Sequence, residues 1–284
     1  MRVAVVGAGG GLGAAIVAEC AAVHETVAFT RAELDVSDDA AVAAAMARVR
    51  PDVIVNGAAY TDVDGSEAHP VDALNVNTFA VRALARAAAA HGATLVHYST
   101  DFVFDGTATT PYTELDQTNP RSVYAVSKLL GEWFASDAPR AYVLRVESLF
   151  GRAAGAGPEK GSVAGILRTL TSGGVPKVFE DRTISPTYAI DAARATRQLF
   201  ESEAPAGTYH CVNSGSCTWL AFAQELARQL GIEPRLEPVR MSDMTLKAAR
   251  PLYCALSNDK LRAIGIDMPP WQDAVRRHLA ARTG

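Results

Sequence analysis

The chain has 284 residues, of which 49% are hydrophobic and 20% charged, and its formal net charge is −4 at pH 7. This length buries a large core in one or two domains, and the composition is that of an ordinary soluble globular protein. The slightly acidic balance excludes a broad attraction to nucleic acid or to anionic membranes, so we expect small-molecule partners or a second copy of the chain in a homodimer.

The chain begins with a four-residue apolar run, residues 3–6, which overlaps the glycine-rich stretch VGAGGGLGAAI. Glycines make a poor apolar helix, because each one costs roughly 0.8–1 kcal/mol relative to alanine inside it. The apolar run is also far shorter than the ~20 residues needed to cross a bilayer. These features disfavour a signal peptide or membrane anchor and predict a strand over 3–6, a tight turn and a helix over 12–20.

Strand-like and helix-like segments then alternate along the chain. The predicted strands are 26–29, 53–56, 94–99 and 141–146, and the predicted helices are 40–49, 71–91 and 122–134. A loop over 104–120 is long enough to favour a functional role. This alternation predicts an α/β fold, a Rossmann-type doubly wound parallel sheet with helices on both faces.

The composition changes after residue 151, where a Gly/Ala/Pro-rich segment begins. We predict a dinucleotide-binding domain over 1–150 and a smaller C-terminal α+β substrate domain mainly over 151–284, with 185–213 returning to the first domain. The predicted elements of this half are helices over 163–170, 188–201, 219–230, 258–264 and 271–281, and strands over 177–179 and 208–212.

The four cysteines form no CxxC pair and no metal-ligand pattern; they are Cys20, Cys211, Cys217 and Cys254. Such cysteines are typical of buried free thiols in a reducing compartment. We therefore expect a cytoplasmic protein.

The glycine-rich stretch gives the spacing Gly7-x-x-Gly10-x-x-Gly13 between a predicted strand and a predicted helix. Residues without side chains let backbone N–H groups approach a pyrophosphate, and the helix dipole favours its charge. This context predicts dinucleotide binding, with a purely structural turn as the alternative. Arg31 stands where an NAD-selective site usually has an acidic residue, which favours the 2′-phosphate of NADP; a solvated surface arginine is the alternative.

Tyr124 and Lys128 are four residues apart, so on a helix they share one face. A free phenol titrates near ~10, and a nearby ammonium lowers that pKa, so we expect Lys128 to make Tyr124 a better proton donor. Ser99 and Thr100 end the predicted strand 94–99 at the carboxyl edge of the sheet, where ligands bind in such folds. Together these residues predict a hydroxyl, a phenol and an ammonium around a carbonyl group.

The chain resembles, nearly end to end, the extended short-chain dehydrogenase/reductases, and within them the dTDP-4-dehydrorhamnose reductase group. The resemblance rests on Gly7, Gly10 and Gly13 and on the stretches LDVSD (34–38), PDVIVNGAAYTDVDGSE (51–67), HYSTDFVFDG (97–106), PYTELDQTNP (111–120), YAVSK (124–128), ISPTYAIDAA (184–193) and YHCVNSGSCTW (209–219).

This resemblance implies roles for individual residues. The implied catalytic residues are Thr100, Tyr124 and Lys128. The implied cofactor-binding residues are Gly7, Gly10, Gly11, Leu12, Gly13, Arg31, Asp35, Val36, Ala58, Ala59, Tyr60, Asn77, Ser99, Tyr124 and Lys128, with Asp35 and Val36 beside the adenine and Asn77 supporting the tyrosine and lysine. The implied substrate-binding residues are Val63, Thr100, Asp101, Phe102, Tyr124, Ser148, Arg182 and Arg250.

Two departures from the family pattern fall in the substrate set. The family has a tyrosine after the STD triplet and a tryptophan in an RTSWVYG-like strand end, where this chain has Phe102 and Ser148. Some relatives form a metal-bridged dimer through a carboxylate after the glycine loop, where this chain has Ala14 and Ala15, so we expect no metal. For Asp101, Arg182 and Arg250 a purely structural role is the alternative.

The function implied is an NADPH-preferring reductase, with NADH also open, that acts on a nucleotide-linked 4-keto-6-deoxysugar. In it Tyr124 is the general acid. The alternatives are a reductase for another nucleotide sugar, an epimerase or dehydratase that retains NAD, and a non-catalytic regulatory subunit with a reductase-like fold.

Overall fold

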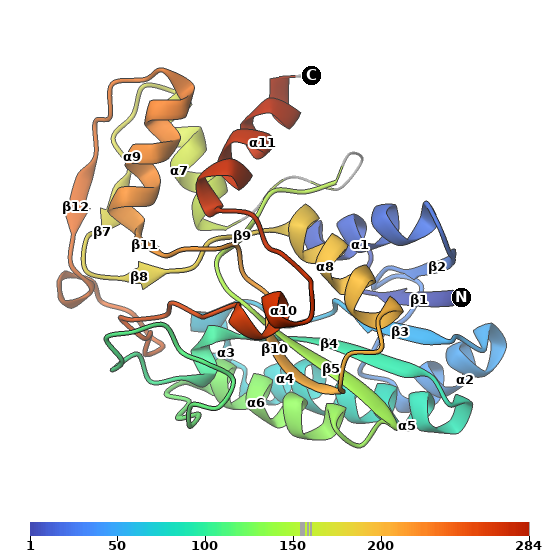
Figure 1. Ribbon diagram of the computed structural model, residues 1–284. Helices are drawn as coiled ribbons and strands as arrows, with labels where there is room; N and C mark the ends of the chain where they lie inside the picture. The colour runs from blue at the N-terminus through green and yellow to red at the C-terminus, as the bar shows by residue number, and fades with distance from the viewer. Residues whose placement is uncertain (154–156, 158, 160, 284) are drawn as a thin grey trace.

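The computed structural model describes residues 1–153, 157, 159 and 161–283. Its main sheet has the strand order β2-β1-β3-β4-β5-β10, and every neighbouring pair is parallel (Figure 1). These strands are β1 (Arg2–Val6), β2 (Glu25–Phe29), β3 (Val53–Asn56), β4 (Thr94–Thr100), β5 (Arg140–Val146) and β10 (Gly207–His210). The strand order reverses between β1 and β3, which is where ligands bind in doubly wound sheets. The predicted fold class is confirmed.

Helices cover both faces of this sheet (Figure 1). They are α1 (Gly11–Ala21) and α8 (Ala189–Glu201) on one face, and α2 (Asp39–Val49), α5 (Ala80–His91) and α6 (Val123–Ala135) on the other. Successive residues of β1 pack into the hydrophobic cores on opposite faces of the sheet. Val3 and Val5 pack on the α1/α8 side, whereas Ala4 and Val6 pack on the α2/α5 side. Burial on both faces explains why the strands read as continuous apolar runs.

The single helix predicted over 71–91 is wrong in detail. The structure has α3 (Val63–Ala68), α4 (Pro70–Leu74), a π-helical turn (Asn75–Phe79) and then α5. Within the π turn, the side chain of Asn77 accepts from the backbone N–H of Tyr60 at 2.9 Å and donates to its carbonyl at 3.0 Å. An extra residue inserted into a helix in this way often marks a functional site.

The second half of the chain adds a smaller body with its own core, in which Phe150, Phe222 and Trp271 are buried. Its helices are α7 (Ser162–Thr171), α9 (Trp219–Leu230) and α11 (Trp271–Thr283), and α10 (Asp259–Ala263) packs near β10. Its short strand pairs are β6 (Leu149–Phe150) with β9 (Thr187–Tyr188), β7 (Lys177–Phe179) with β12 (Glu237–Val239), and β8 (Thr183–Ile184) with β11 (Cys217–Thr218). Strands of two or three residues are too short to show an alternating pattern, and of these short strands only β7 was predicted.

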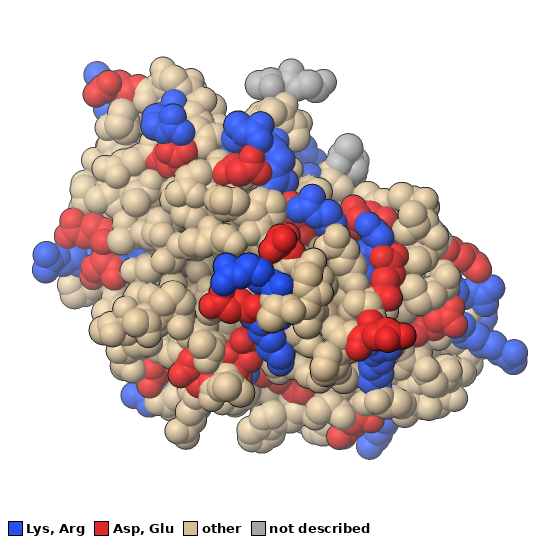
Figure 2. Space-filling model, in the orientation of Figure 1, with Lys and Arg blue, Asp and Glu red and all other residues tan. Residues whose placement is uncertain are grey.

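Charged residues of both signs are interspersed over the face shown in Figure 2. In the part of the chain that the structure describes, no helix is both long and apolar enough to cross a membrane. All four cysteines are free, and Cys20, Cys211 and Cys254 are buried.

Candidate active site

The glycine loop after β1 is shaped first by backbone packing. Gly7 has a φ of +79°, and a Cβ there would lie 2.5 Å from the nitrogen of Ala58 in the segment after β3. A Cβ on Gly13 would lie 2.2 Å from the Gly7 carbonyl oxygen. These two glycines are required by the protein itself, because any side chain would push β1, α1 and the end of β3 apart.

Backbone packing does not require the glycines that lie between Gly7 and Gly13. A Cβ on Gly9, Gly10 or Gly11 would meet its nearest neighbour only at 3.5–3.7 Å, which is ordinary contact. Gly10 is the N-cap of α1 and offers no side-chain cap, and the first turn of the helix carries no acidic residue. The free N–H groups and the positive end of the helix dipole therefore favour a negatively charged group here. The residues fit the diphosphate of a dinucleotide.

Two cavities meet at this loop along the carboxyl edge of the sheet. They measure about 780 Å³ and 720 Å³ and share Gly9, Gly10, Gly57 and Ala59. The predicted residues that line the first are Gly10, Gly11, Leu12, Gly13, Ala59, Ser99, Tyr124 and Lys128. Those that line the second are Gly7, Gly10, Arg31, Asp35, Val36, Ala58, Ala59 and Tyr60. The predicted cofactor residues thus surround one continuous groove.

Asp35 is fixed in the second cavity by its own turn. Its Oδ1 accepts from the backbone N–H of Ser37 at 3.0 Å and from its hydroxyl at 2.7 Å. These hydrogen bonds lower the pKa of Asp35, and Arg31 contributes in the same direction. The carboxylate is therefore ionised and oriented at neutral pH.

Asn77 is the one predicted cofactor residue that lines neither cavity. It is buried, holds the backbone of Tyr60 at the cavity wall, and donates to the hydroxyl of Ser127 at 3.0 Å. Asn77 therefore links the loop after β3 to α6, the helix that carries Tyr124 and Lys128.

The predicted catalytic pair, Tyr124 and Lys128, lies on the first turns of α6 and lines the first cavity. Lys128 is buried, and its Nζ donates to the carbonyl of Tyr98 in β4 at 2.5 Å. The ring of Tyr124 meets the ring of Phe102 edge-on, with centroids 5.5 Å apart. The phenol and the ammonium therefore face the same cavity, as the four-residue spacing predicts.

The prediction that Lys128 lowers the pKa of Tyr124 is wrong. Burial raises the pKa of Tyr124 to about 12, Asp101 raises it further, and only a hydrogen bond with Thr100 lowers it. Burial also lowers the pKa of Lys128 to about 8, against the carboxylate of Glu132, which raises it. Tyr124 is a protonated phenol at neutral pH, which is the form that a proton donor needs.

A buried ion pair ties α6 to the sheet. Arg145 on β5 makes two hydrogen bonds to Glu132 on α6, at 2.8 and 2.9 Å, and Ser99 donates to the same carboxylate at 2.5 Å. Both side chains of the ion pair are less than a tenth exposed. Ser99, predicted to bind cofactor, thus also helps to orient α6, which carries Tyr124 and Lys128.

The other predicted substrate residues line neither cavity, but Thr100, Asp101 and Phe102 interact with Tyr124. Thr100 donates to Asp101 at 2.9 Å, and the Arg182 guanidinium lies over the Phe102 ring, 5.3 Å from its centroid. Ser148, just after β5, has a φ of +43°, a strained backbone for a residue with a side chain.

Val63 and Arg250 lie in a different place. Val63 begins α3, and Arg250 makes a two-pronged ion pair with Asp64 on that helix, at 2.8 and 3.0 Å. The pair lowers the pKa of Asp64 to about 2 and fastens the C-terminal segment to α3.

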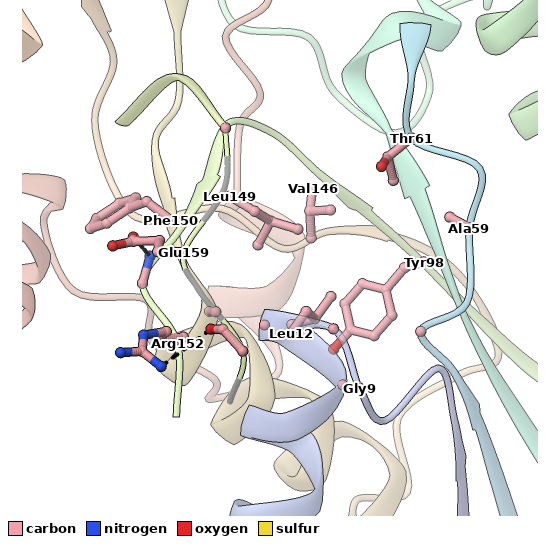
Figure 3. A pocket seen from close by; sticks show the side chains of 18 of the residues that line it. Gly9, Leu12, Ala59, Thr61, Tyr98, Val146, Leu149, Phe150, Arg152 and Glu159 are labelled. Atoms are coloured by element: carbon pink, nitrogen blue, oxygen red, sulfur yellow. Dashed lines mark hydrogen bonds between the residues drawn. The ribbon is translucent and has the colours of Figure 1, made fainter. Parts of the chain in front are cut away.

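The sequence interpretation missed one wall of the first cavity. Figure 3 shows Tyr98, Val146 and Leu149 around it, with Glu159 accepting from the backbone N–H of Gly151 at 2.8 Å. Tyr98 and Val146 lie near the carboxyl ends of β4 and β5, and Leu149 follows β5, so their position at this edge of the sheet could have identified them.

The structure combines a parallel sheet, a glycine loop at its switch point, and a tyrosine and a lysine on the adjoining helix. These features define an NAD(P)-dependent oxidoreductase of the short-chain dehydrogenase/reductase class. The family described as "RmlD substrate binding domain" matches residues 1–283. The dTDP-4-dehydrorhamnose reductase of Streptomyces griseus is 36% identical over 265 residues, which cover 90% of this chain and 86% of the relative.

Solved structures that resemble this chain point to the same family. A dTDP-4-dehydrorhamnose reductase from Clostridium acetobutylicum has a TM-score of 0.93 to this chain at 31% identity, with 100% of both chains covered. The Bacillus anthracis enzyme of that name, solved in complex with NADP, has a TM-score of 0.91 at 30% identity, with 99% of each covered. The chain belongs to the RmlD family of dTDP-4-dehydrorhamnose reductases, so the resemblance drawn from its motifs is confirmed.

Proposed function

We propose that this chain reduces the 4-keto group of a nucleotide-linked 6-deoxysugar with NADPH as the preferred coenzyme. The observation that carries the proposal is the convergence of Ser99, Tyr124 and Lys128 on a cavity continuous with the glycine-loop groove. The NADP complex of the Bacillus anthracis relative supports the coenzyme, as does the exposed Arg31 at the wall of the second cavity, where a guanidinium suits a 2′-phosphate.

When bound, the reduced coenzyme supplies the hydride that reaches C4 of the sugar. Tyr124 then donates its phenolic proton to the developing alkoxide. Thr100, beside it, donates its hydroxyl proton to Asp101 in the free protein and would turn it towards the same oxygen when the sugar binds. Lys128 would present a charged donor to the nicotinamide ribose. The burial of Lys128 and the partial burial of Tyr124 strengthen these interactions, because water competes less in a low-dielectric site.

The low pKa of Lys128 gives a pH dependence. Since the ammonium is lost above about pH 8 while Tyr124 stays protonated to about 12, kcat/KM for NADPH should fall about tenfold per pH unit above that point. Initial rates across an alkaline pH series measure this. Lys128→Arg keeps its charge over the whole range, so the falling limb should disappear; an identical limb in that variant would contradict the assignment.

The identity of the sugar depends on the departures at Phe102 and Ser148. Phe102 has no hydroxyl to offer a substrate, and Ser148 fills far less space than a tryptophan. These two residues favour, as a second candidate, a reductase for a different nucleotide sugar in the same class. We also propose that the enzyme works in the cytoplasm, in keeping with its free thiols.

A panel of 4-keto nucleotide sugars, including dTDP-4-dehydrorhamnose, tests the proposal through the loss of NADPH absorbance. We expect turnover of at least one member of the panel, with a kcat of roughly 1–10³ s⁻¹, the usual range for enzymes. Phe102→Tyr with Ser148→Trp should shift the preference within the panel towards dTDP-4-dehydrorhamnose if the departures set specificity. Absence of NADPH consumption with every sugar would reject the reductase assignment.

A further inference from the structure

A buried cluster of charged residues lies behind the catalytic tyrosine. It joins Asp101 after β4, Glu147 after β5, Arg182 before β8 and Cys254 in the C-terminal segment, which are 3%, 2%, 8% and 1% exposed. An oxygen of each carboxylate and the Cys254 sulfur lie within 4.8 Å of one another. The catalytic proposal above does not use Glu147, Arg182 or Cys254.

Hydrogen bonding in the cluster is incomplete. Asp101 accepts from the Thr100 hydroxyl at 2.9 Å through Oδ1, and Glu147 accepts from the Ser185 backbone N–H at 2.5 Å through Oε2. The remaining oxygens, Asp101 Oδ2 and Glu147 Oε1, are buried without a hydrogen-bond partner, and so is the Nε of Arg182. Buried polar groups are nearly always satisfied, so two bare acceptors beside each other need an explanation.

The charge balance is also incomplete. Arg182 is the one cation in ion-pair range of the cluster among the described residues, with Nη2 3.9 Å from Asp101 Oδ2 and 3.5 Å from Cys254 Sγ. Two ionised carboxylates would therefore leave one net negative charge in the interior. Like charges in such proximity favour uptake of a proton by one of them.

We propose that the Asp101–Glu147 pair holds one proton, that it resides on Glu147, and that Glu147 is a positioning residue that sets the charge beside Tyr124. The proton converts Oε1 of Glu147 from a bare acceptor into a donor towards Asp101 Oδ2 or Cys254 Sγ. Glu147 carries it because Arg182 is in ion-pair range of Asp101, which also accepts from the Thr100 hydroxyl. Glu147 is held by the Ser185 backbone N–H and the Ser148 side chain, and no cation among the described residues forms an ion pair with it.

The titration behaviour agrees with this geometry. Burial and then the charge of Asp101 raise the pKa of Glu147 well above its usual value. Burial also raises the pKa of Asp101, and the charge of Arg182 offsets part of the effect of burial at both carboxylates. The titratable and charged groups that face Glu147 are Asp101, Arg182, Cys254 and, from β11, Cys217. Burial raises the pKa of both thiols, so neither is a negative charge at neutral pH.

The cluster reaches Tyr124 in two ways. The charge of Asp101 raises the pKa of Tyr124, and Arg182 lies over the Phe102 ring that packs edge-on against the phenol. With Glu147 neutral, the charges of Asp101 and Arg182 balance. Ionised Glu147 would add a second negative charge, hold the phenolic proton more tightly and make Tyr124 a weaker acid. This consequence for catalysis rests on the proposed function; the protonation state does not.

Glu147→Gln tests the protonation state without any substrate, because glutamine has the same shape and is neutral at every pH. An unfolded glutamate titrates near ~4.3, so above that pH the wild-type chain must hold in the folded state a proton that the unfolded chain has released. The raised pKa of Glu147 therefore leaves the fold at its full stability below pH ~4.3, and the free energy of unfolding decreases as the pH rises above that value. Relative to wild type, the folding equilibrium constant of Glu147→Gln should rise about tenfold per pH unit until folded Glu147 ionises.

Glu132→Gln is the matched control, since Glu132 is as buried but fully paired with Arg145. It should be less stable than wild type at neutral pH. If Glu147→Gln behaves like this control, Glu147 is an ionised partner of Arg182 and the proposal is wrong. An infrared difference spectrum at neutral pH should show the band of a protonated carboxylic acid in wild type that Glu147→Gln lacks; its absence would also overturn the proposal.

Two further outcomes separate the parts of the proposal. A stoichiometric divalent cation in the purified protein that Glu147→Gln loses would show that a metal, not a proton, joins the carboxylates. With an active sugar substrate, the ratio of kcat for Glu147→Gln to that for wild type should rise with pH, because only wild type gains the second negative charge. A constant ratio with the stability result intact would reject the influence on Tyr124 alone.

Discussion

Tyr124→Phe is expected to lower turnover by about 10²–10⁴-fold, the usual contribution of a general acid. The substitution removes the phenolic proton that the proposal gives to the alkoxide and keeps the ring that packs against Phe102. Binding of NADPH should remain within a few-fold of wild type, because Lys128 and the glycine loop are untouched. Steady-state rates with an active sugar, and fluorescence titration with NADPH, measure the two quantities separately.

A matched control for this variant is Tyr209→Phe. The Tyr209 hydroxyl donates to the Pro205 carbonyl at 2.7 Å, and Tyr209 does not line the cavity that Tyr124 lines, so its removal should leave turnover near wild type. A Tyr124→Phe enzyme that retained wild-type kcat would mean that the alkoxide takes its proton from another donor.

Glu132→Gln is expected to lower the free energy of unfolding by about 3–5 kcal/mol, the range found when one partner of a buried ion pair is removed. The variant removes the negative charge that faces the buried Arg145 guanidinium and replaces one of its two acceptor oxygens by an NH2 group, which cannot accept. Urea denaturation at neutral pH gives the difference, provided that the m-value is unchanged.

The control for the ion pair is Glu237→Gln at the protein surface. Glu237 and Lys177 form a salt bridge of 3.2 Å, but their side chains are 49% and 63% exposed, so water replaces the interaction at little cost. The unfolding free energy of this variant should be nearly that of wild type. A Glu132→Gln protein as stable as the Glu237→Gln protein would show that the buried pair does not hold α6 to the sheet.

The sequence predicted the parts of the site that have local signatures. The glycine spacing, the buried strands and the Tyr124–Lys128 pair each lie within one short segment, and the structure places them around one groove. The π turn at Asn75–Phe79 escaped because its alanine-rich surroundings have ordinary helical periodicity. The strands of two or three residues, β7 excepted, escaped because they are too short to show an alternating pattern.

The electrostatics of the site were not predictable from local pattern. Burial, not the neighbouring ammonium, dominates the pKa of Tyr124, and burial is a property of the folded chain. The Glu132–Arg145 pair and the approach of Glu147 to Arg182 join residues that are distant in sequence. Their partners become visible only once β4, β5 and the C-terminal segments are assembled.

The central claim is transfer of hydride from NADPH to C4 of a nucleotide-linked keto sugar. The most direct measurement uses NADPH deuterated at the transferable position of its nicotinamide ring, with an active 4-keto sugar, followed by NMR of the product. The account predicts one deuterium at C4 for each NADPH consumed. A product with hydrogen only at C4, or deuterium at another carbon, would contradict it.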